Sequence, residues 1–210
     1  MSKKLRPELI SACSRHACPV FEADGYRCLL LAYTRSFSAS GVKHRVDVGA
    51  QWSPSSQPGA LVMVYPRFYV FAPGVNEIYN EMTDSSLPRG SKTPLLNVPL
   101  DWFSAEESGY WYVMSKADFD PVVREFADFY STYVRGPVDE LDTLEGLVVA
   151  GETADRRFVS SRQDRIIAAA AAMVIGAPDR ALRILELGFP SAGARRTYAQ
   201  AFEYVESRQV

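Results

Sequence analysis

Four side chains with metal-binding or nucleophilic atoms lie close together near the start of the chain. Cys13, His16, Cys18 and Cys28 fall within sixteen residues. Thiolate and imidazole groups bind zinc, but structural zinc sites use short paired spacings such as Cys-x₂₋₄-Cys. Cys13 and Cys18 are five residues apart, which places them on different faces of a helix. We therefore expect three reduced thiols, no bound metal and no cofactor.

Nucleophilic catalysis also has few candidates in this sequence. His16 and His44 are the two histidines, and Ser14 and Cys13 lie near His16 without a Gly-x-Ser-x-Gly elbow. His44 belongs to an alternating stretch, where we expect a surface or half-buried residue of a sheet. Walker, Gly-x-Gly-x-x-Gly and His-Glu-x-x-His motifs are absent from the sequence. The sequence therefore indicates no catalytic residue and favours a role other than catalysis.

The most unusual stretch, residues 101–155, combines negative charge with large aromatic rings. It holds thirteen carboxylates and three cations, a net charge of −10, whereas residues 1–100 and 156–210 each carry +4. Trp102-Phe103 and Tyr110-Trp111-Tyr112 stand near its start. Carboxylates beside amphipathic rings attract a basic partner and then anchor it. The composition therefore predicts a binding surface for a basic protein.

Carboxylates would steer the partner towards this surface, and one tryptophan and one tyrosine would anchor it. The predicted partner-binding residues are Asp101, Trp102, Glu106, Glu107, Tyr110, Asp139, Glu140 and Asp142. Trp102 and Phe103 suit a hydrophobic core equally well, because aromatic side chains bury large areas. An acidic helix face in solvent would give the same charge count.

The whole chain of 210 residues carries −2. This total argues against a nucleic-acid partner, because nucleic-acid-binding proteins carry a basic surplus. The N-terminal lysines are not followed by an apolar run of the kind that a secretory signal needs. The longest apolar stretch, residues 166–175, is far shorter than the roughly 20 residues that span a bilayer. We therefore expect a cytoplasmic protein with no membrane partner.

The elements that position these residues change type along the chain. A short helix is expected over residues 5–18, followed by three strands over 27–37, 42–52 and 61–71. Short connections between the strands favour antiparallel neighbours. Pro66 cannot donate a hydrogen bond within a sheet, so we expect it at an edge or a bulge. Residues 83–109 look like a long loop, and a fourth strand over 110–114 returns to the sheet.

Helical periodicity begins at Asp118. It predicts helices over residues 118–133, 138–149, 162–175, 179–187 and 191–207. Gly136-Pro137 is expected to end the first helix before the second begins. Strands followed by helices indicate an α+β fold, in which an antiparallel sheet in the N-terminal half is covered by a C-terminal layer of helices. We expect one domain over 1–210, sheet-rich over 1–115 with one N-terminal helix, and helical over 116–210.

The order of these features resembles a family of bacterial domains of unknown function that stand beside polymorphic toxins as immunity proteins. The resemblance rests on the strand-turn-strand over 42–52 and 61–75, the Tyr110-Trp111-Tyr112 strand, and the helices over 118–133 and 137–147. It implies a non-enzymatic protein that occludes a toxin in a stoichiometric complex. No catalytic residue carries over from it.

The leading interpretation is therefore an immunity protein or antitoxin, which neutralises a basic toxin by covering its active site with the acidic, aromatic surface. A second interpretation is an enzyme with a pocket between sheet and helices, lined by His44, Arg67 or Tyr69. A third is a structural subunit of a phage or secretion assembly that docks through the helical tail over 162–207.

Overall fold

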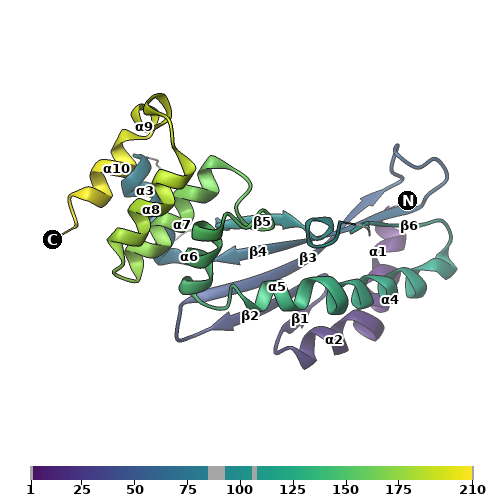
Figure 1. Cartoon of the computed structure of the whole chain (residues 1–210). Coiled ribbons are helices and arrows are strands. Elements are labelled where there is room, and N and C mark those ends of the chain that lie inside the picture. The colour runs from purple at the N-terminus through teal and green to yellow at the C-terminus, as the bar shows by residue number, and fades with distance from the viewer. Residues whose placement is uncertain (1, 85–92, 106–107, 210) are drawn as a thin grey trace. The chain divides into compact units, whose positions relative to one another are not determined.

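The computed structural model describes residues 2–84, 93–105 and 108–209 (Figure 1). The chain divides into two compact units, and each unit draws on three stretches of sequence. Unit 1 comprises Met1–Ser36, His44–Tyr69 and Asn97–Asp139. Unit 2 comprises Phe37–Lys43, Val70–Leu96 and Glu140–Val210. Within the described ranges, no helix has the length and apolar character needed to cross a membrane.

Six strands form a single sheet in the order β1-β2-β3-β4-β5, and β6 pairs with β4. β1 and β2 are antiparallel, as are β4 and β6. The strands are β1 (Arg27–Leu29), β2 (Ala32–Phe37), β3 (Val42–Trp52), β4 (Val62–Phe71), β5 (Leu96–Pro99) and β6 (Trp111–Val113). The predicted α+β class is confirmed, and β6 is the predicted returning strand.

The predicted strand over 27–37 is in fact a hairpin of two strands. Leu30 adopts a left-handed backbone with φ of 56°, and the chain turns back on itself there. Leu29 and Leu30 are 66% and 55% exposed. A left-handed backbone at a turn is usually marked by glycine or asparagine. Neither residue stands at this turn, so the sequence did not predict it. Residues 27–71 therefore hold four strands where the sequence predicts three.

β3 alternates between a buried and an open face, as predicted. Val42, His44, Val46 and Val48 are buried, and the side chains between them are half-buried or exposed. The expectation that His44 is a surface or half-buried residue is wrong, because its exposed fraction is 0%. Its ring packs edge to face on Phe68, with 5.0 Å between ring centres. His44 shares the period-two face of the three valines, so it is buried with them.

Pro66 was predicted at an edge or a bulge. It lies in β4, which has β3 on one side and β5 and β6 on the other, so the edge position is wrong. β6 pairs with residues 62–64 of β4, and the carbonyl of Val70 accepts a hydrogen bond from the backbone of Leu95, just before β5.

Helices of unit 1 pack on the sheet through aromatic rings. Phe21 stacks on Tyr33 of β2, with 4.1 Å between ring centres, and contacts Tyr130 at 4.1 Å and Phe126 at 5.8 Å. The N-terminal helix runs further than predicted and includes a π-helical turn. The elements are α1 (Ser2–Ala12), π-helix η1 (Cys13–Ala17), α2 (Cys18–Ala23), 3₁₀ helices η2 (Leu100–Phe103) and η3 (Lys116–Asp118), α4 (Phe119–Phe129), π-helix η4 (Tyr130–Val134) and α5 (Arg135–Asp139).

The helix that begins at Phe119 continues through Gly136-Pro137, so the predicted break there is wrong. α4, η4 and α5 follow one another without a gap from Phe119 to Asp139. Proline in a regular α-helix clashes with the carbonyl four residues earlier. A π turn changes this spacing, and η4 stands directly before α5. The next helix begins at Leu144, later than the predicted start near 138.

Unit 2 is helical and is organised around one alanine-rich helix. Its elements are α3 (Pro73–Thr83), α6 (Leu144–Thr153), α7 (Arg162–Val174), α8 (Pro178–Gly188), α9 (Ala192–Thr197) and α10 (Ala199–Glu206). α7 contacts α3, α6 and α8. A Cβ atom added to Gly151 of α6 would lie 2.5 Å from Cβ of Ala168, so small residues allow α6 and α7 to approach closely. α3, which starts with proline in its first turn, is not predicted from the sequence.

Candidate partner-binding site

The two predicted anchors lie at the surface of unit 1. Trp102, in η2, and Tyr110, just before β6, are each 44% exposed. Asp101 is half-buried beside Trp102. Gly109 lies so close to Asp101 that an added Cβ atom would overlap the backbone of Asp101. This close approach holds the segment of Tyr110 against the segment of Trp102, so the two anchors belong to one surface.

The other predicted residues are spread over both units. Asp139 is in unit 1, whereas Glu140 and Asp142 are in unit 2. Glu106 and Glu107 lie outside the described residues. No single unit therefore carries all eight predicted residues.

Arginines from outside residues 101–155 neutralise much of the acidic stretch. Among the described residues, six carboxylates of this stretch take part in the ion pairs given next. The pairs are Arg15–Asp120 (2.6 Å), Arg35–Asp139 (2.8 Å), Arg157–Glu140 (3.1 Å), Arg157–Asp155 (2.6 Å), Arg180–Glu145 (2.6 Å) and Arg180–Glu152 (2.8 Å). The net charge of −10 therefore overstates the field of this stretch, and the predicted steering residues Asp139 and Glu140 are paired.

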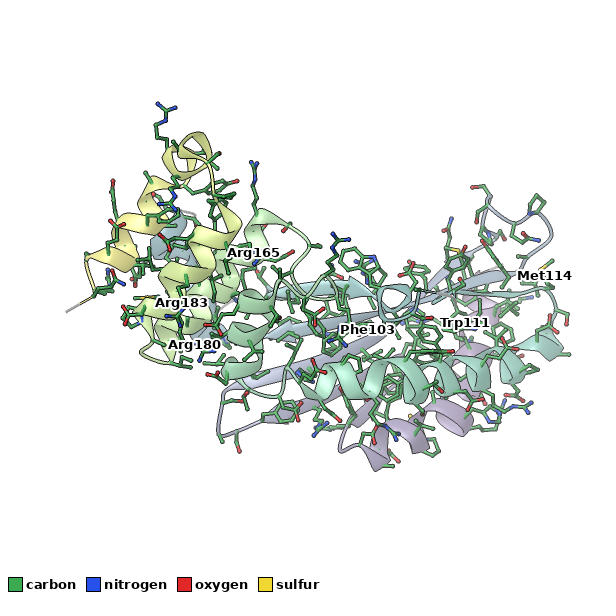
Figure 2. The ribbon with its side chains drawn as sticks, viewed as in Figure 1. Phe103, Trp111, Met114, Arg165, Arg180 and Arg183 are labelled. Carbon is green, nitrogen blue, oxygen red and sulfur yellow. The ribbon has the colours of Figure 1, made fainter. Side chains whose placement is uncertain are left out.

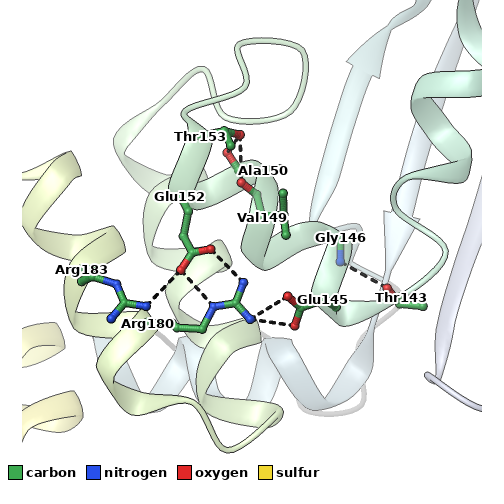
Figure 3. Close-up of polar contacts among 9 residues, drawn as sticks. All are labelled: Thr143, Glu145, Gly146, Val149, Ala150, Glu152, Thr153, Arg180 and Arg183. Atoms are coloured by element: carbon green, nitrogen blue, oxygen red, sulfur yellow. Dashed lines mark hydrogen bonds and ion pairs between the residues drawn. The ribbon is translucent and has the colours of Figure 1, made fainter.

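The strongest of these networks lies in unit 2 and centres on Arg180 (Figure 3). Its guanidinium group donates to both oxygens of Glu145, at 2.6 and 2.8 Å, and of Glu152, at 2.9 and 2.8 Å. Arg183 also donates to Glu152 at 3.5 Å. These hydrogen bonds raise the pKa of Arg180 and lower the pKa of Glu152. The network joins α6 to α8 and leaves these carboxylates unavailable to a partner.

Glu125 and Asp128 of α4 differ from the paired carboxylates. Both side chains are exposed, and neither makes an ion pair or a side-chain hydrogen bond with any part of the chain that the structure describes. They line an open pocket in unit 1 with a volume of about 300 Å³. We call it the acidic-aromatic pocket; its lining residues are Ser108, Trp111, Glu125, Asp128, Phe129, Thr132 and Tyr133.

Three aromatic rings form the wall of the acidic-aromatic pocket. Trp111 points from β6 towards α4 (Figure 2), and α4 and β6 are in contact. The ring of Trp111 meets Phe129 edge to face at 5.6 Å, and Phe129 contacts Tyr133 at 5.1 Å. Trp111 also lies 5.9 Å from Phe126, which is fully buried. The wall is therefore continuous with the core of unit 1, which holds the rings in place.

The π-helix η4 positions the far end of this pocket. A π turn contains one residue more than an α turn, and such turns are frequent at functional sites. Thr132 and Tyr133, both pocket residues, belong to η4. η4 also contacts η2, the element that carries Trp102. The π turn therefore connects the acidic-aromatic pocket to one of the predicted anchors.

The chemistry of this pocket suits a cation. Carboxylates accept hydrogen bonds from guanidinium and ammonium groups, and aromatic faces attract the same groups through their quadrupoles. Glu125 and Asp128 are three residues apart on one helix, so like charges lie close together. A bound cation would relieve that repulsion, which the protein alone does not.

Sequence reasoning did not single out Glu125, Asp128 or Tyr133. Phe129 is buried, whereas Tyr133 is half-buried and Glu125 and Asp128 are exposed. Trp111 does point to the opposite side from the Tyr110–Tyr112 pair, whose rings are 5.8 Å apart. The i, i+3 spacing of two acidic residues beside an aromatic stripe is the signal that could have pointed to the pocket.

The residues suggested for catalysis do not form a site. His44 is buried on the helix-facing side of the sheet, whereas Arg67 and Tyr69 alternate with the buried residues of β4 and lie on its other face. The Arg67 side chain instead donates to the side chain and carbonyl of Asn97, at 2.6 and 3.1 Å. His44 therefore does not line one site together with Arg67 and Tyr69.

The thiols show no sign of activation. Burial raises the pKa of Cys13 to about 11 and raises the pKa of Cys28. A raised thiol pKa means little thiolate at neutral pH and low nucleophilicity. Among the described residues, no group of three or more His, Cys, Asp or Glu side chains is arranged to hold a metal ion.

Comparison with protein-family models, curated proteins and solved structures gives no match for this chain.

Proposed function

We propose that this protein is a non-enzymatic, cytoplasmic binding protein, an immunity protein or antitoxin, that neutralises a basic toxin by covering its active site. The observation that supports this proposal best is the acidic-aromatic pocket of unit 1. It combines Glu125 and Asp128, which lack a cation among the described residues, with the rings of Trp111, Phe129 and Tyr133.

A partner with a protruding arginine or lysine would complete this pocket. A guanidinium group donates two parallel hydrogen bonds to a carboxylate and stacks on an aromatic ring, which suits both walls of the pocket. Trp102, which is exposed on η2 and whose element contacts η4, would supply apolar contact area near that cation. Toxins that act on nucleic acids have positively charged clefts, and a carboxylate surface competes for such a cleft.

The decisive experiment isolates the partner and removes charge from the pocket alone. Tagged protein is used to capture partners from the cells that produce it naturally, and the captured protein is assayed with and without this chain. The pocket variant is Glu125→Gln with Asp128→Asn. The matched control is Glu203→Gln with Glu206→Gln, two exposed carboxylates of α10 with the same spacing and charge change.

We expect wild-type protein and the α10 control to retain one basic protein at equal stoichiometry and to inhibit its activity. The pocket variant should bind that partner roughly 10- to 100-fold more weakly, because a charge-assisted contact is lost. Association with wild-type protein should slow as salt is raised, since steering is electrostatic. An acidic partner, a partner that stays active in the complex, or equal binding by both variants would contradict the proposal.

The anchor Trp102 is tested separately. Because Trp102 is exposed, Trp102→Ala should leave the fold intact and speed dissociation of the complex, at a cost of about 2–4 kcal/mol if the ring fills a pocket of the partner. Circular dichroism and surface plasmon resonance distinguish the two effects. Unfolding of the isolated variant would show that Trp102 belongs to the core.

A further inference from the structure

A second pocket lies in unit 2 and shares no residue with the proposed partner-binding site. Its volume is about 430 Å³, within the range of small-molecule sites. α3 and α7 form part of the wall, and the residues around the start of α10 complete it. The lining residues are Tyr79, Met82, Thr83, Gln163, Ile166, Thr197, Tyr198, Gln200 and Ala201.

The lining of this pocket is polar but carries no charged side chain. Two phenol groups, two amides and two hydroxyls share the lining with an apolar surface to which Met82, Ile166 and Ala201 contribute. Amide and hydroxyl groups both donate and accept hydrogen bonds. Two of these groups also bond to the backbone of their own helix: Thr83 donates to Tyr79 and Thr197 donates to Gly193. Their oxygen atoms still have a free lone pair to accept from a ligand.

Hydrogen bonds fix the walls of the pocket in place. Tyr204 donates to the carboxylate of Glu81 at 2.7 Å, and Gln200 donates to the backbone carbonyl of Glu81 at 3.1 Å. These bonds tie α10 to α3. The ring of Tyr198 packs on Phe189 with 4.3 Å between ring centres. Burial raises the pKa of Tyr79, so its hydroxyl keeps its proton and can donate.

We propose that this unit 2 pocket binds a neutral ring that carries neighbouring hydroxyl groups, as in a sugar or in the ribose of a nucleoside. Each hydroxyl of such a ring both donates and accepts, which matches the amides of Gln163 and Gln200 and the hydroxyls beside them. The C–H face of the ring matches the apolar surface and the tyrosine rings.

The absence of charged lining residues narrows the ligand class. A phosphate or carboxylate placed here would lose hydration and find no cation among the nine lining residues to replace it. The pocket therefore selects against nucleotides, sugar phosphates and amino acids. It favours the uncharged members of the same chemical families.

Ligand-observed saturation-transfer NMR on the full chain tests this proposal. The probes are glucose, maltose and uridine at millimolar concentration, with glucose 6-phosphate as the charged comparison. We expect saturation transfer to at least one neutral probe and none to glucose 6-phosphate. Saturation transfer to glucose or maltose identifies the ligand class as sugars, and transfer to uridine alone identifies it as nucleosides.

Two substitutions assign the binding to this pocket. Gln163 is exposed and makes no side-chain hydrogen bond with the described chain, so Gln163→Ala should not affect folding. Tyr79→Phe removes a single hydroxyl. Each should weaken binding of the neutral probe roughly five- to tenfold, whereas Gln57→Ala, an exposed glutamine in a turn of unit 1, should have no effect.

Three results would overturn the proposal: no transfer to any neutral probe, binding that both pocket substitutions leave unchanged, or stronger binding of glucose 6-phosphate. None of them bears on the acidic-aromatic pocket, whose variants and readout are different.

Discussion

Two groups of carboxylates in the same acidic stretch have different surroundings. Glu145 and Glu152 of α6 share Arg180, whose side chain is 24% exposed. Glu125 and Asp128 of α4 have no cation within the described chain and stand beside aromatic rings. The first pair stabilises the packing of unit 2, and the second pair is free to bind. The difference shows that the charge of a stretch does not reveal which of its carboxylates a partner can reach.

Removal of Arg180 should give the largest effect and tests the structural half of this comparison. Arg180→Met leaves the exposed Glu145 without a described cation and leaves the half-buried Glu152 with Arg183 alone, so we expect the free energy of unfolding to fall by about 1 kcal/mol. Urea denaturation followed by circular dichroism measures it. Arg162→Met is the control, because Arg162 is exposed and has no ion pair among the described residues. Equal effects of the two substitutions would show that the network contributes little.

Acid should weaken the Arg180 network. The resulting fall in the free energy of unfolding should be smaller than that caused by Arg180→Met. Hydrogen bonds from Arg180 hold the pKa of Glu152 below its ordinary value of 4.5. A carboxyl with a lowered pKa in the folded state stabilises the fold above its ordinary pKa, and this contribution is lost as the pH falls through the folded value. Stability should therefore fall as the pH drops below about 4.5.

The Arg180→Met variant provides the control for this acid effect. Its stability should fall less than that of wild-type protein between pH 7 and pH 3, since its Glu152 has already lost the main cation that lowers its pKa and keeps only Arg183. Urea midpoints at each pH measure the difference. Parallel curves for the two proteins would assign the acid sensitivity to other carboxylates, such as Asp155 with Arg157.

The pocket pair should give the smallest effect on folding, and of opposite sign. Glu125→Gln with Asp128→Asn removes repulsion between like charges on one helix, so we expect the free energy of unfolding to rise by about 0.3 kcal/mol. Glu152→Gln should lower it. Thermal and urea unfolding of both variants at low salt measure the two changes. A loss of stability in the pocket variant would mean that Glu125 and Asp128 support the fold, and the functional half of the comparison would fail.

The fold class could be predicted because its signals are local. The alternation in β3 and the 3–4 spacing after Asp118 are read from a few neighbouring residues. The errors came where tertiary context decided the outcome. The turn at Leu30 carries no turn residue, and Pro66 stands in a central strand. His44 is buried with the valines on the same face of β3, although its side chain is polar.

The candidate site could be predicted only in part. Trp102 and Tyr110 are exposed, as their acidic surroundings suggested. The prediction of steering residues was less successful, because Asp139 pairs with Arg35 and Glu140 pairs with Arg157. Both arginines lie outside the acidic stretch of the sequence. No pattern among neighbouring residues of the sequence indicates these ion pairs. Glu125 and Asp128 stand out only once the arginines of the described chain have been placed.

The π turn at η4 has a consequence for how this protein tolerates genetic change. A π turn holds one residue more than an α turn, so deletion of Ser131 would restore regular α-helix and leave the residues after the turn facing the same way. Arg135 would keep Asp24, which it contacts at 2.7 Å. Tyr133 lies inside the turn and would shift relative to Phe129. A single in-frame deletion there should therefore spare the fold and change mainly the acidic-aromatic pocket.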